Sequence, residues 1–311
     1  MGIFNRKKLI VTHDGAFHGD DVFAAAIVSE YFQRVGIPVR IVRSRDAALL
    51  AQARVVFDTG GLHDPSQLRF DHHQKGGAGA RANGMPFAAC GLVWQAFGME
   101  LCRGDRELFE KVDREIIQYI DAHDNGVATE TFIPPTTAVR NFSDVWMILT
   151  PTWAEPNSRE DMTRAFLTAA AAARDYLVRI LKVMADDIAG AREIKRTYDT
   201  SAQKDLLILD RDYGRPLSQS TLGPLEGTKF YINRGSNGWS IEAVAVSLDT
   251  FEKKAQFPES WAGLKDSELE KVTGVAGATF CHNGRFVCKT KTKEAALALV
   301  EKALTLLEPN H

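Results

Sequence analysis

The sequence predicts an α/β protein with a doubly wound, mainly parallel sheet, a helical linker and a smaller C-terminal α/β domain. Near the N-terminus, short apolar runs alternate with segments of helical periodicity, and this alternation is typical of parallel sheets. A long proline-free segment of helical character follows, and beyond residue 205 the pattern changes to short strands. A length of 311 residues is enough for about two domains.

The elements of the first domain are expected in the order strand, helix, strand, helix, strand, at residues 7–12, 21–36, 38–44, 46–53 and 53–61. Gly36 is expected to end the first helix. The third strand ends at Asp58, which two glycines follow. Helical periodicity returns at residues 87–98 and 106–124. Because ligands of open parallel sheets bind beyond the carboxyl ends of the strands, functional residues are expected there.

The second half of the chain begins with an alanine-rich segment at 159–200, which we interpret as a connecting helix. It separates a predicted domain at 1–158 from a predicted domain at 201–311, of α/β or α+β class, in which short strands precede a closing helix. The connecting helix is interpreted as a hinge or as part of a homodimer contact. The sequence leaves these two alternatives open.

Composition and charge exclude several classes of protein. Lys plus Arg total 38 and Asp plus Glu total 40, so a formal charge of −2 excludes a polybasic protein that coats nucleic acid. The four cysteines form no CxxC pair and are interpreted as reduced thiols. No apolar stretch approaches the roughly 20 residues of a membrane span, and the apolar run near the N-terminus is too short for a signal peptide. A cytoplasmic location is therefore expected.

Histidines and aspartates gather at the expected strand and helix ends of the first domain. These candidates are His13, His18, Asp20, Asp58, Asp71, His72, His73, Asp121 and Asp124. Imidazole and carboxylate groups together suit divalent ions such as Mn²⁺, Mg²⁺, Zn²⁺ or Fe²⁺. The aspartates exceed what one tetrahedral zinc ion needs, and this favours two ions that share a bridging carboxylate.

Individual residues also have explanations that need no metal. Asp58 fits a turn or a helix cap, and Asp20 fits the cap of a helix that starts at Asp21. His63 and His123 are interpreted as surface or polar-core histidines. The metal interpretation is favoured because all the patterns occur together, in order, on one α/β chain.

The chain resembles the DHH phosphoesterase superfamily, which includes RecJ-type exonucleases and family II inorganic pyrophosphatases. The resemblance rests on the segments THDGAFHGDDVFA, FDTGG, FDHHQKG and YIDAHDNG. The same segments are more similar to one branch, the melanocyte-proliferating-gene (Myg) family of metal-dependent hydrolases, and three later segments resemble that branch as well: NRGSNGWSIEAV, FPESWAGL and FCHNGRF. The resemblance covers nearly the whole chain and implies a DHH-type catalytic domain.

The resemblance also implies a role for each candidate. One ion would be held by His13, His18 and Asp58, and a second by Asp20, Asp58, His72 and Asp124, with Asp58 bridging the two. His73 would face the substrate phosphate, and Asp71 would orient a histidine. Asp121 stays an alternative to Asp124, because spacing does not separate them. His18 stands where many superfamily members carry aspartate, which shifts the expected metal from Mg²⁺ towards Mn²⁺ or Zn²⁺.

The C-terminal domain is loosely similar to the substrate domain that accompanies DHH domains. The Gly-Gly-Gly-His motif of that domain is reduced here to two separated glycines and His282. We expect His282, Arg285, Lys289 and Arg234 to form a basic wall that binds phosphates. A solvated strand face is an equally good interpretation of these charges.

Taken together, the residues and the resemblance predict a two-metal phosphoesterase, with Mn²⁺ favoured and Mg²⁺ or Zn²⁺ as alternatives. The resemblance further implies a 3′–5′ exonuclease that acts on single-stranded RNA or a short oligonucleotide. Two other functions stay open. One is the hydrolysis of small phosphates such as dinucleotides, nucleotides or pyrophosphate, and the other is non-catalytic binding of a nucleotide or RNA by a metal-bound protein.

Overall fold

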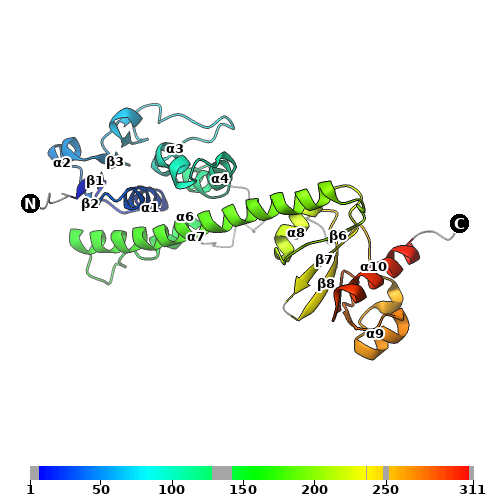
Figure 1. Cartoon of the computed structure of the whole chain (residues 1–311). Helices are drawn as coiled ribbons and strands as arrows, with labels where there is room; N and C mark the ends of the chain where they lie inside the picture. Colours follow the sequence, from blue (N-terminus) through cyan, green and yellow to red (C-terminus); the bar gives the residue numbers. More distant parts are fainter. Residues whose placement is uncertain (1–6, 128–141, 236, 248–251, 308–311) are drawn as a thin grey trace, which may run out of the picture. The chain divides into compact units, whose positions relative to one another are not determined.

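The computed structural model describes residues 7–127, 142–235, 237–247 and 252–307. They form two compact units that divide between Ala185 and Asp186 (Figure 1). The α/β class is confirmed, since both units contain a five-stranded sheet with helices. Within the described residues, no helix is both long enough and apolar enough to cross a membrane.

The sheet of the first unit has the strand order β2-β1-β3-β5-β4. Its strands are β1 (Lys8–Thr12), β2 (Val39–Arg43), β3 (Val55–Phe57), β4 (His63–Asp64) and β5 (Arg69–Phe70). The pairs β1–β2, β1–β3 and β3–β5 are parallel, and β4 adds an antiparallel edge to β5. The three predicted strands are confirmed, and the described sheet is mixed but mainly parallel. The doubly wound arrangement stays a prediction.

Helix α1 (Gly19–Arg34) lies between the sheet and later helices. Its apolar run from Val22 to Val28 is completely buried, as expected for a helix covered on several sides. It packs against α3 (Ala89–Leu101) and α6 (Phe142–Met147). The short helix α2 (Ala47–Gln52) begins at Asp46, whose side chain accepts a hydrogen bond from the amide of Leu49.

The helical stretch expected at 106–124 is interrupted. It consists of α4 (Arg106–Val112), a π-helical turn (Asp113–Ile117) and α5 (Gln118–Asp124). A π-helical turn takes in an extra residue, so the side chains that follow it are rotated relative to an unbroken α-helix. Such turns are frequent at functional sites, and this one directly precedes the helix that carries Asp121 and Asp124.

Helix α7 (Arg159–Thr200) runs for 42 residues without a break, over the segment that the sequence assigns to the connecting helix (Figure 1). The boundary between the two compact units lies inside α7, after Ala185. The predicted division into a catalytic domain, a linker and a substrate-binding domain stays a prediction.

The sheet of the second unit has the order β6-β7-β8-β10-β9. Its strands are β6 (Leu206–Ile208), β7 (Phe230–Gly235), β8 (Gly238–Ala243), β9 (Ala278–Cys281) and β10 (Val287–Thr290), and its further helices are α8 (Arg215–Leu222), α9 (Asp266–Thr273) and α10 (Lys293–Leu307). Only β6–β7 is a parallel pair among these described strands. Of the two classes expected for this unit, α/β and α+β, the mixed and mostly antiparallel sheet favours α+β, because antiparallel strands need no helical crossover between them.

Candidate metal centre

The carboxyl ends of three neighbouring parallel strands meet at one edge of the first sheet. The loop after β1 carries His13 and His18, β3 leads into Asp58, and β5 leads into the Asp71–His73 segment. Because β1, β3 and β5 are adjacent and parallel, these segments lie side by side although up to sixty residues separate them in sequence. The sheet topology thus creates the site that the sequence predicts.

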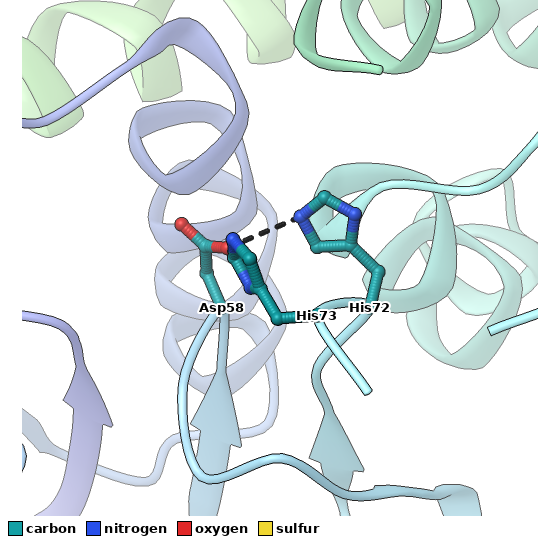
Figure 2. A group of neighbouring side chains, drawn as sticks. All are labelled: Asp58, His72 and His73. Atoms are coloured by element: carbon teal, nitrogen blue, oxygen red, sulfur yellow. Dashed lines mark ion pairs between the residues drawn. The ribbon is translucent and has the colours of Figure 1, made fainter. Parts of the chain in front are cut away.

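Asp58 lies at the centre of this edge, with its side chain 5% exposed. Its Oδ2 atom is 3.2 Å from Nε2 of His13, and its Oδ1 atom is 3.4 Å from Nε2 of His72. His73 places Nδ1 at 3.5 Å from the same Oδ1 atom, so both histidines turn toward Asp58 (Figure 2). The backbone of Asp58 is left-handed (φ +54°), a conformation that aspartate tolerates better than most residues. Its two oxygens therefore face two different groups of candidate ligands.

Most of the predicted residues line one cavity of about 560 Å³. Those that line it are His13, His18, Asp58, His72, His73 and Asp124, together with Gly15, Ala16, Arg45 and Asn125. The three remaining candidates of the first domain, Asp20, Asp71 and Asp121, are buried at 0–2% exposure.

The two aspartates of α5 have different surroundings. Asp124 lines the cavity, and its Oδ2 atom is 3.3 Å from Nε2 of His72. Asp121 is completely buried, with one oxygen 2.7 Å from Arg81 and the other accepting a hydrogen bond from the amide of Gly91. This geometry supports Asp124 as the ligand of the pair.

Asp20 caps a helix, although not the one in which it lies. Its two oxygens accept hydrogen bonds from the amides of Ala89 (3.2 Å) and Cys90 (2.6 Å), at the start of α3. Asp20 also offers an oxygen within 4.8 Å of ligand atoms of His72 and Asp124. The capping role and the ligand role are therefore compatible, since each carboxylate oxygen has two lone pairs.

Asp21 is a candidate that the sequence reasoning missed. Its Oδ2 atom is 2.9 Å from Nε2 of His13, and its Oδ1 atom accepts a hydrogen bond from the amide of His18. His13, Asp21 and Asp58 form one of the groups in the described chain with ligand atoms close enough to hold a metal ion. The doubled aspartate of His18-Gly-Asp-Asp was the available signal, but sequence assigns no direction to either side chain.

Four buried polar atoms of this site have no hydrogen-bond partner among the described residues. They are Nε2 of His13, Oδ2 of Asp21, Oδ1 of Asp58 and Nε2 of His72. Buried polar atoms are nearly always hydrogen-bonded, and here the unpartnered atoms are nitrogen and oxygen ligands that face one another. Divalent cations fit this donor set.

The electrostatics of the site also favour positive charge. Burial alone would lower the pKa of His13, but Asp21 and Asp58 outweigh it and raise that pKa to about 9. Burial and the neighbouring carboxylates of Asp124, Asp58 and Asp121 raise the pKa of Asp20 well above its usual range. Closely spaced carboxylates repel one another, and a bound cation removes this repulsion.

Asp71 and His73 form a pair at the mouth of the cavity. Oδ2 of Asp71 accepts a hydrogen bond from the amide of Gly61, whose positive φ of +67° suits glycine. Oδ1 of Asp71 lies 2.8 Å from Nδ1 of His73, and the His73 side chain is 63% exposed. Asp71 therefore orients His73 and leaves the second ring nitrogen available.

The four predicted substrate-binding residues of the second unit do not all line the same one of its described cavities. Lys289 lines a cavity of about 350 Å³, whereas Arg285 lines a different one of about 490 Å³ and contacts Gln256. Arg234 is exposed on β7, and the His282 ring packs on Phe286 at 4.3 Å. Lys289 and Arg285 therefore line separate cavities, and a joint substrate-binding role of the four residues stays a prediction.

One cation of the second unit was missed by the sequence reasoning. Arg215 lines the same cavity as Lys289, and its guanidinium lies over the ring of Phe286 at 4.6 Å. It begins helix α8, which the periodicity of the sequence did not reveal.

The profile of the MYG1_exonuc family, described as an uncharacterised protein family (UPF0160), matches residues 9–304. The chain belongs to this family. The resemblance to the Myg branch is thereby confirmed, and with it the expectation of a nuclease, since the family model and several relatives carry the name exonuclease.

Individual relatives are similar over almost their whole length. The MYG1 protein of Chlamydia pneumoniae is 30% identical over 297 residues, which cover 93% of each chain. The MYG1 exonuclease of Homo sapiens is 27% identical over 338 residues, covering 96% of this chain and 88% of the human one. A crystal structure of RecJ in complex with Mn²⁺ from Thermus thermophilus aligns at 14% identity and a TM-score of 0.29, over 97% of this chain and 52% of RecJ. A TM-score this low supports no inference about fold or activity.

Proposed function

We propose that this chain is a two-metal phosphodiesterase of DHH type that removes nucleotides from the 3′ end of single-stranded RNA or short oligonucleotides. The observation that carries the proposal is the position of Asp58, whose two oxygens face separate groups of nitrogen and oxygen ligands. A carboxylate in this position is suited to bridge two ions. The names of the mammalian relatives, which are exonucleases, support the same reaction.

The proposed ligands fall into two groups that share Asp58. His13, His18 and Asp58 would hold one ion, with Asp21 beside His13, and Asp20, Asp58, His72 and Asp124 would hold the other. The mixture of imidazole and carboxylate favours Mn²⁺, with Mg²⁺ or Zn²⁺ as alternatives. Bound ions would supply hydroxide near neutral pH and offset negative charge on the phosphoryl oxygens.

The remaining steps belong to side chains of the protein. Asp71 holds His73 by Nδ1, so the other ring nitrogen is positioned to bind a phosphate oxygen at the cavity mouth. Arg45 adds a cation to the wall of the same cavity. In the second unit, Lys289, Arg285, Arg234 and His282 are the proposed contacts to the rest of the nucleic acid.

A second candidate is the hydrolysis of small phosphates such as dinucleotides, nucleotides or pyrophosphate. The observation that favours it is the cavity of about 560 Å³, a size typical of small-molecule sites. Analysis of products separates the two candidates. An exonuclease shortens a long 5′-labelled RNA stepwise and releases a 3′ label at once as a mononucleotide, whereas a small-phosphate hydrolase turns over a dinucleotide and leaves the long RNA intact.

The first prediction concerns Asp58→Asn, which is preferred to alanine because asparagine also tolerates the left-handed backbone. The variant is expected to fold normally and to lose Mn²⁺-dependent hydrolysis of a 5′-labelled single-stranded RNA, because the shared ligand is gone. The matched control is Asp64→Asn, since the Asp64 side chain lies at the surface and accepts hydrogen bonds from Ser66 and Gln67. Full activity of Asp58→Asn would refute the two-metal assignment.

A further inference from the structure

Arg81 lies in the glycine-rich loop that follows Asp71-His72-His73, yet its side chain is only 7% exposed. Its Nε and Nη2 atoms donate to the two oxygens of Asp113 at 2.9 and 2.8 Å, and Nη1 donates to Oδ2 of Asp121 at 2.7 Å. The guanidinium also lies 4.3 Å from the centre of the Phe87 ring. One buried cation therefore joins two buried aspartates.

The loop backbone fixes the position of Arg81. Its amide donates to the carbonyl of Met85, and its carbonyl accepts from the amide of Gly84, so the loop closes on itself like a small hairpin. The left-handed backbone of Gly84 (φ +83°) permits this turn. A bridge between Ala80 and Pro86 completes it. The loop backbone thus holds Arg81 in place independently of its contacts with Asp113 and Asp121.

Asp121 continues the connection to helix α3. Its Oδ1 atom accepts a hydrogen bond from the amide of Gly91 at 2.9 Å. A Cβ atom at Gly91 would lie 2.0 Å from Oδ2 of Asp121, so only glycine allows this close approach. The first turn of α3 is therefore packed directly against the carboxylate that Arg81 holds.

The same turn of α3 holds Asp20. The amides of Ala89 and Cys90 donate to Asp20, and the next amide, that of Gly91, donates to Asp121. Three consecutive amides thus fix a proposed metal ligand and the partner of Arg81 together. If Asp121 moved away, the first turn of α3 would lose the hydrogen bond from the amide of Gly91, and Asp20, which bonds to the same turn, would lose its fixed position.

The position of Asp124 also depends on Arg81. Asp124 lies on α5 one turn beyond Asp121, and Arg81 bonds to this helical segment at two points, at Asp113 in the π-helical turn and at Asp121. The proposed ligands Asp20 and Asp124, which come from different helices, are therefore both tied to Arg81.

We propose that Arg81 and Asp121 are positioning residues that align Asp20 and Asp124 for a divalent cation. This inference rests on the metal site of the proposed function. For loss of Arg81, it predicts a change in metal affinity opposite to the one that simple electrostatics predicts. Removal of a buried cation near a cation site should strengthen metal binding by removing repulsion, whereas loss of a positioning residue should weaken it.

The test measures Mn²⁺ binding to the whole chain by titration calorimetry, with Arg81→Gln as the main variant. Its Mn²⁺ affinity is expected to fall about 10- to 100-fold, as for other residues that support metal ligands. Turnover should need correspondingly more Mn²⁺, while kcat at saturating Mn²⁺ stays close to that of the unaltered protein. Asp121→Asn, which keeps an acceptor for Gly91, is expected to weaken binding in the same direction.

The matched control is Arg34→Gln. Arg34 pairs with Glu30 of α1 and donates to the carbonyl of Leu101 at the end of α3, so it joins the two helices that Asp20 also joins, but at their other ends. Its loss should lower the free energy of unfolding and leave Mn²⁺ affinity unchanged.

The other possible results separate the positioning role of Arg81 from the proposed two-metal function. If Arg81→Gln fails to fold, as judged by circular dichroism, Arg81→Lys takes its place, because lysine keeps the positive charge but cannot bond both aspartates in the same geometry, so weaker Mn²⁺ binding then reports the lost positioning. Equal or tighter Mn²⁺ binding by the folded variants would overturn the positioning role, while Mn²⁺-dependent hydrolysis by the unaltered protein would leave the proposed function standing. If the unaltered protein binds no Mn²⁺, the proposed function and this inference fail together.

Discussion

The adjacent residues His72 and His73 lie in different environments. The His72 side chain is 9% exposed, and its Nε2 atom, which has no hydrogen-bond partner in the described part of the chain, lies near both Asp58 and Asp124. His73 is mostly exposed and is held by Asp71. At the scale of the residue, burial and partners therefore distinguish a proposed ligand from a proposed substrate contact.

This difference predicts different losses for two neighbouring substitutions. His72→Ala should reduce Mn²⁺ affinity by more than the roughly 10- to 100-fold expected for a residue behind a ligand. His73→Ala should leave Mn²⁺ affinity nearly unchanged and lower kcat about 100- to 1000-fold, as for loss of one group that stabilises charge on the substrate. Calorimetry and steady-state kinetics measure the two quantities, and identical profiles for both variants would contradict the assignment.

Helices and strands also determine the state of the cysteines. Cys90 and Cys102 lie at the start and end of α3, and Cys281 lies opposite Cys288 in the paired strands β9 and β10. All four are buried and free, as the sequence predicts. Burial raises the pKa of Cys90 well above its ordinary value, and burial likewise raises that of Cys288. Because the thiolate is the reactive form, these thiols should be inert.

We therefore predict that a colorimetric thiol reagent finds no reactive cysteine in the native protein, because even Cys281, whose pKa the hydrogen bond with Cys288 lowers, is completely buried. After unfolding in guanidinium, the four cysteines of the chain should react. Rapid labelling of the native protein would show that α3 or the β9–β10 pair opens readily. A chain that gives fewer than four thiols after unfolding would contradict the free state of the cysteines.

At the scale of the whole molecule, every proposed metal ligand comes from the first compact unit, between His13 and Asp124. A ligand that binds only the folded state stabilises it by mass action, by about 2.7 kcal/mol at a concentration of 100 times Kd. Metal binding should therefore stabilise the first unit directly. The second unit has no share in the proposed ligand set.

Hydrogen exchange measured by mass spectrometry tests this expectation. Mn²⁺, compared with EDTA, should slow exchange in peptides that cover β1, the start of α1, β3 and α5. Peptides from 205–247 and 252–307 should exchange at unchanged rates. Protection of the second unit alone would place the ion elsewhere and contradict the proposed centre.

Local pattern was enough to predict much of the first unit. The alternation of apolar strands and periodic helices placed β1, β2 and β3 and the helices between them, because each run reports its own periodicity. It missed the short helices α8 and α9 and the π-helical turn within 106–124. These are too short to show a period, and tertiary packing decides whether they form.

The sequence by itself determined where the candidate ligands gather, since histidines and aspartates follow the strand ends and this mixture of groups favours divalent cations. Only the tertiary structure decided which of these residues lie at the cavity and which contact other side chains. It separated Asp124 at the cavity from Asp121 beside Arg81, added Asp21 beside His13, and gave Lys289 and Arg285 different cavities. The physical reason is that spacing along the chain fixes neither the direction of a side chain nor its burial. Both are set by contacts between segments that are distant in sequence.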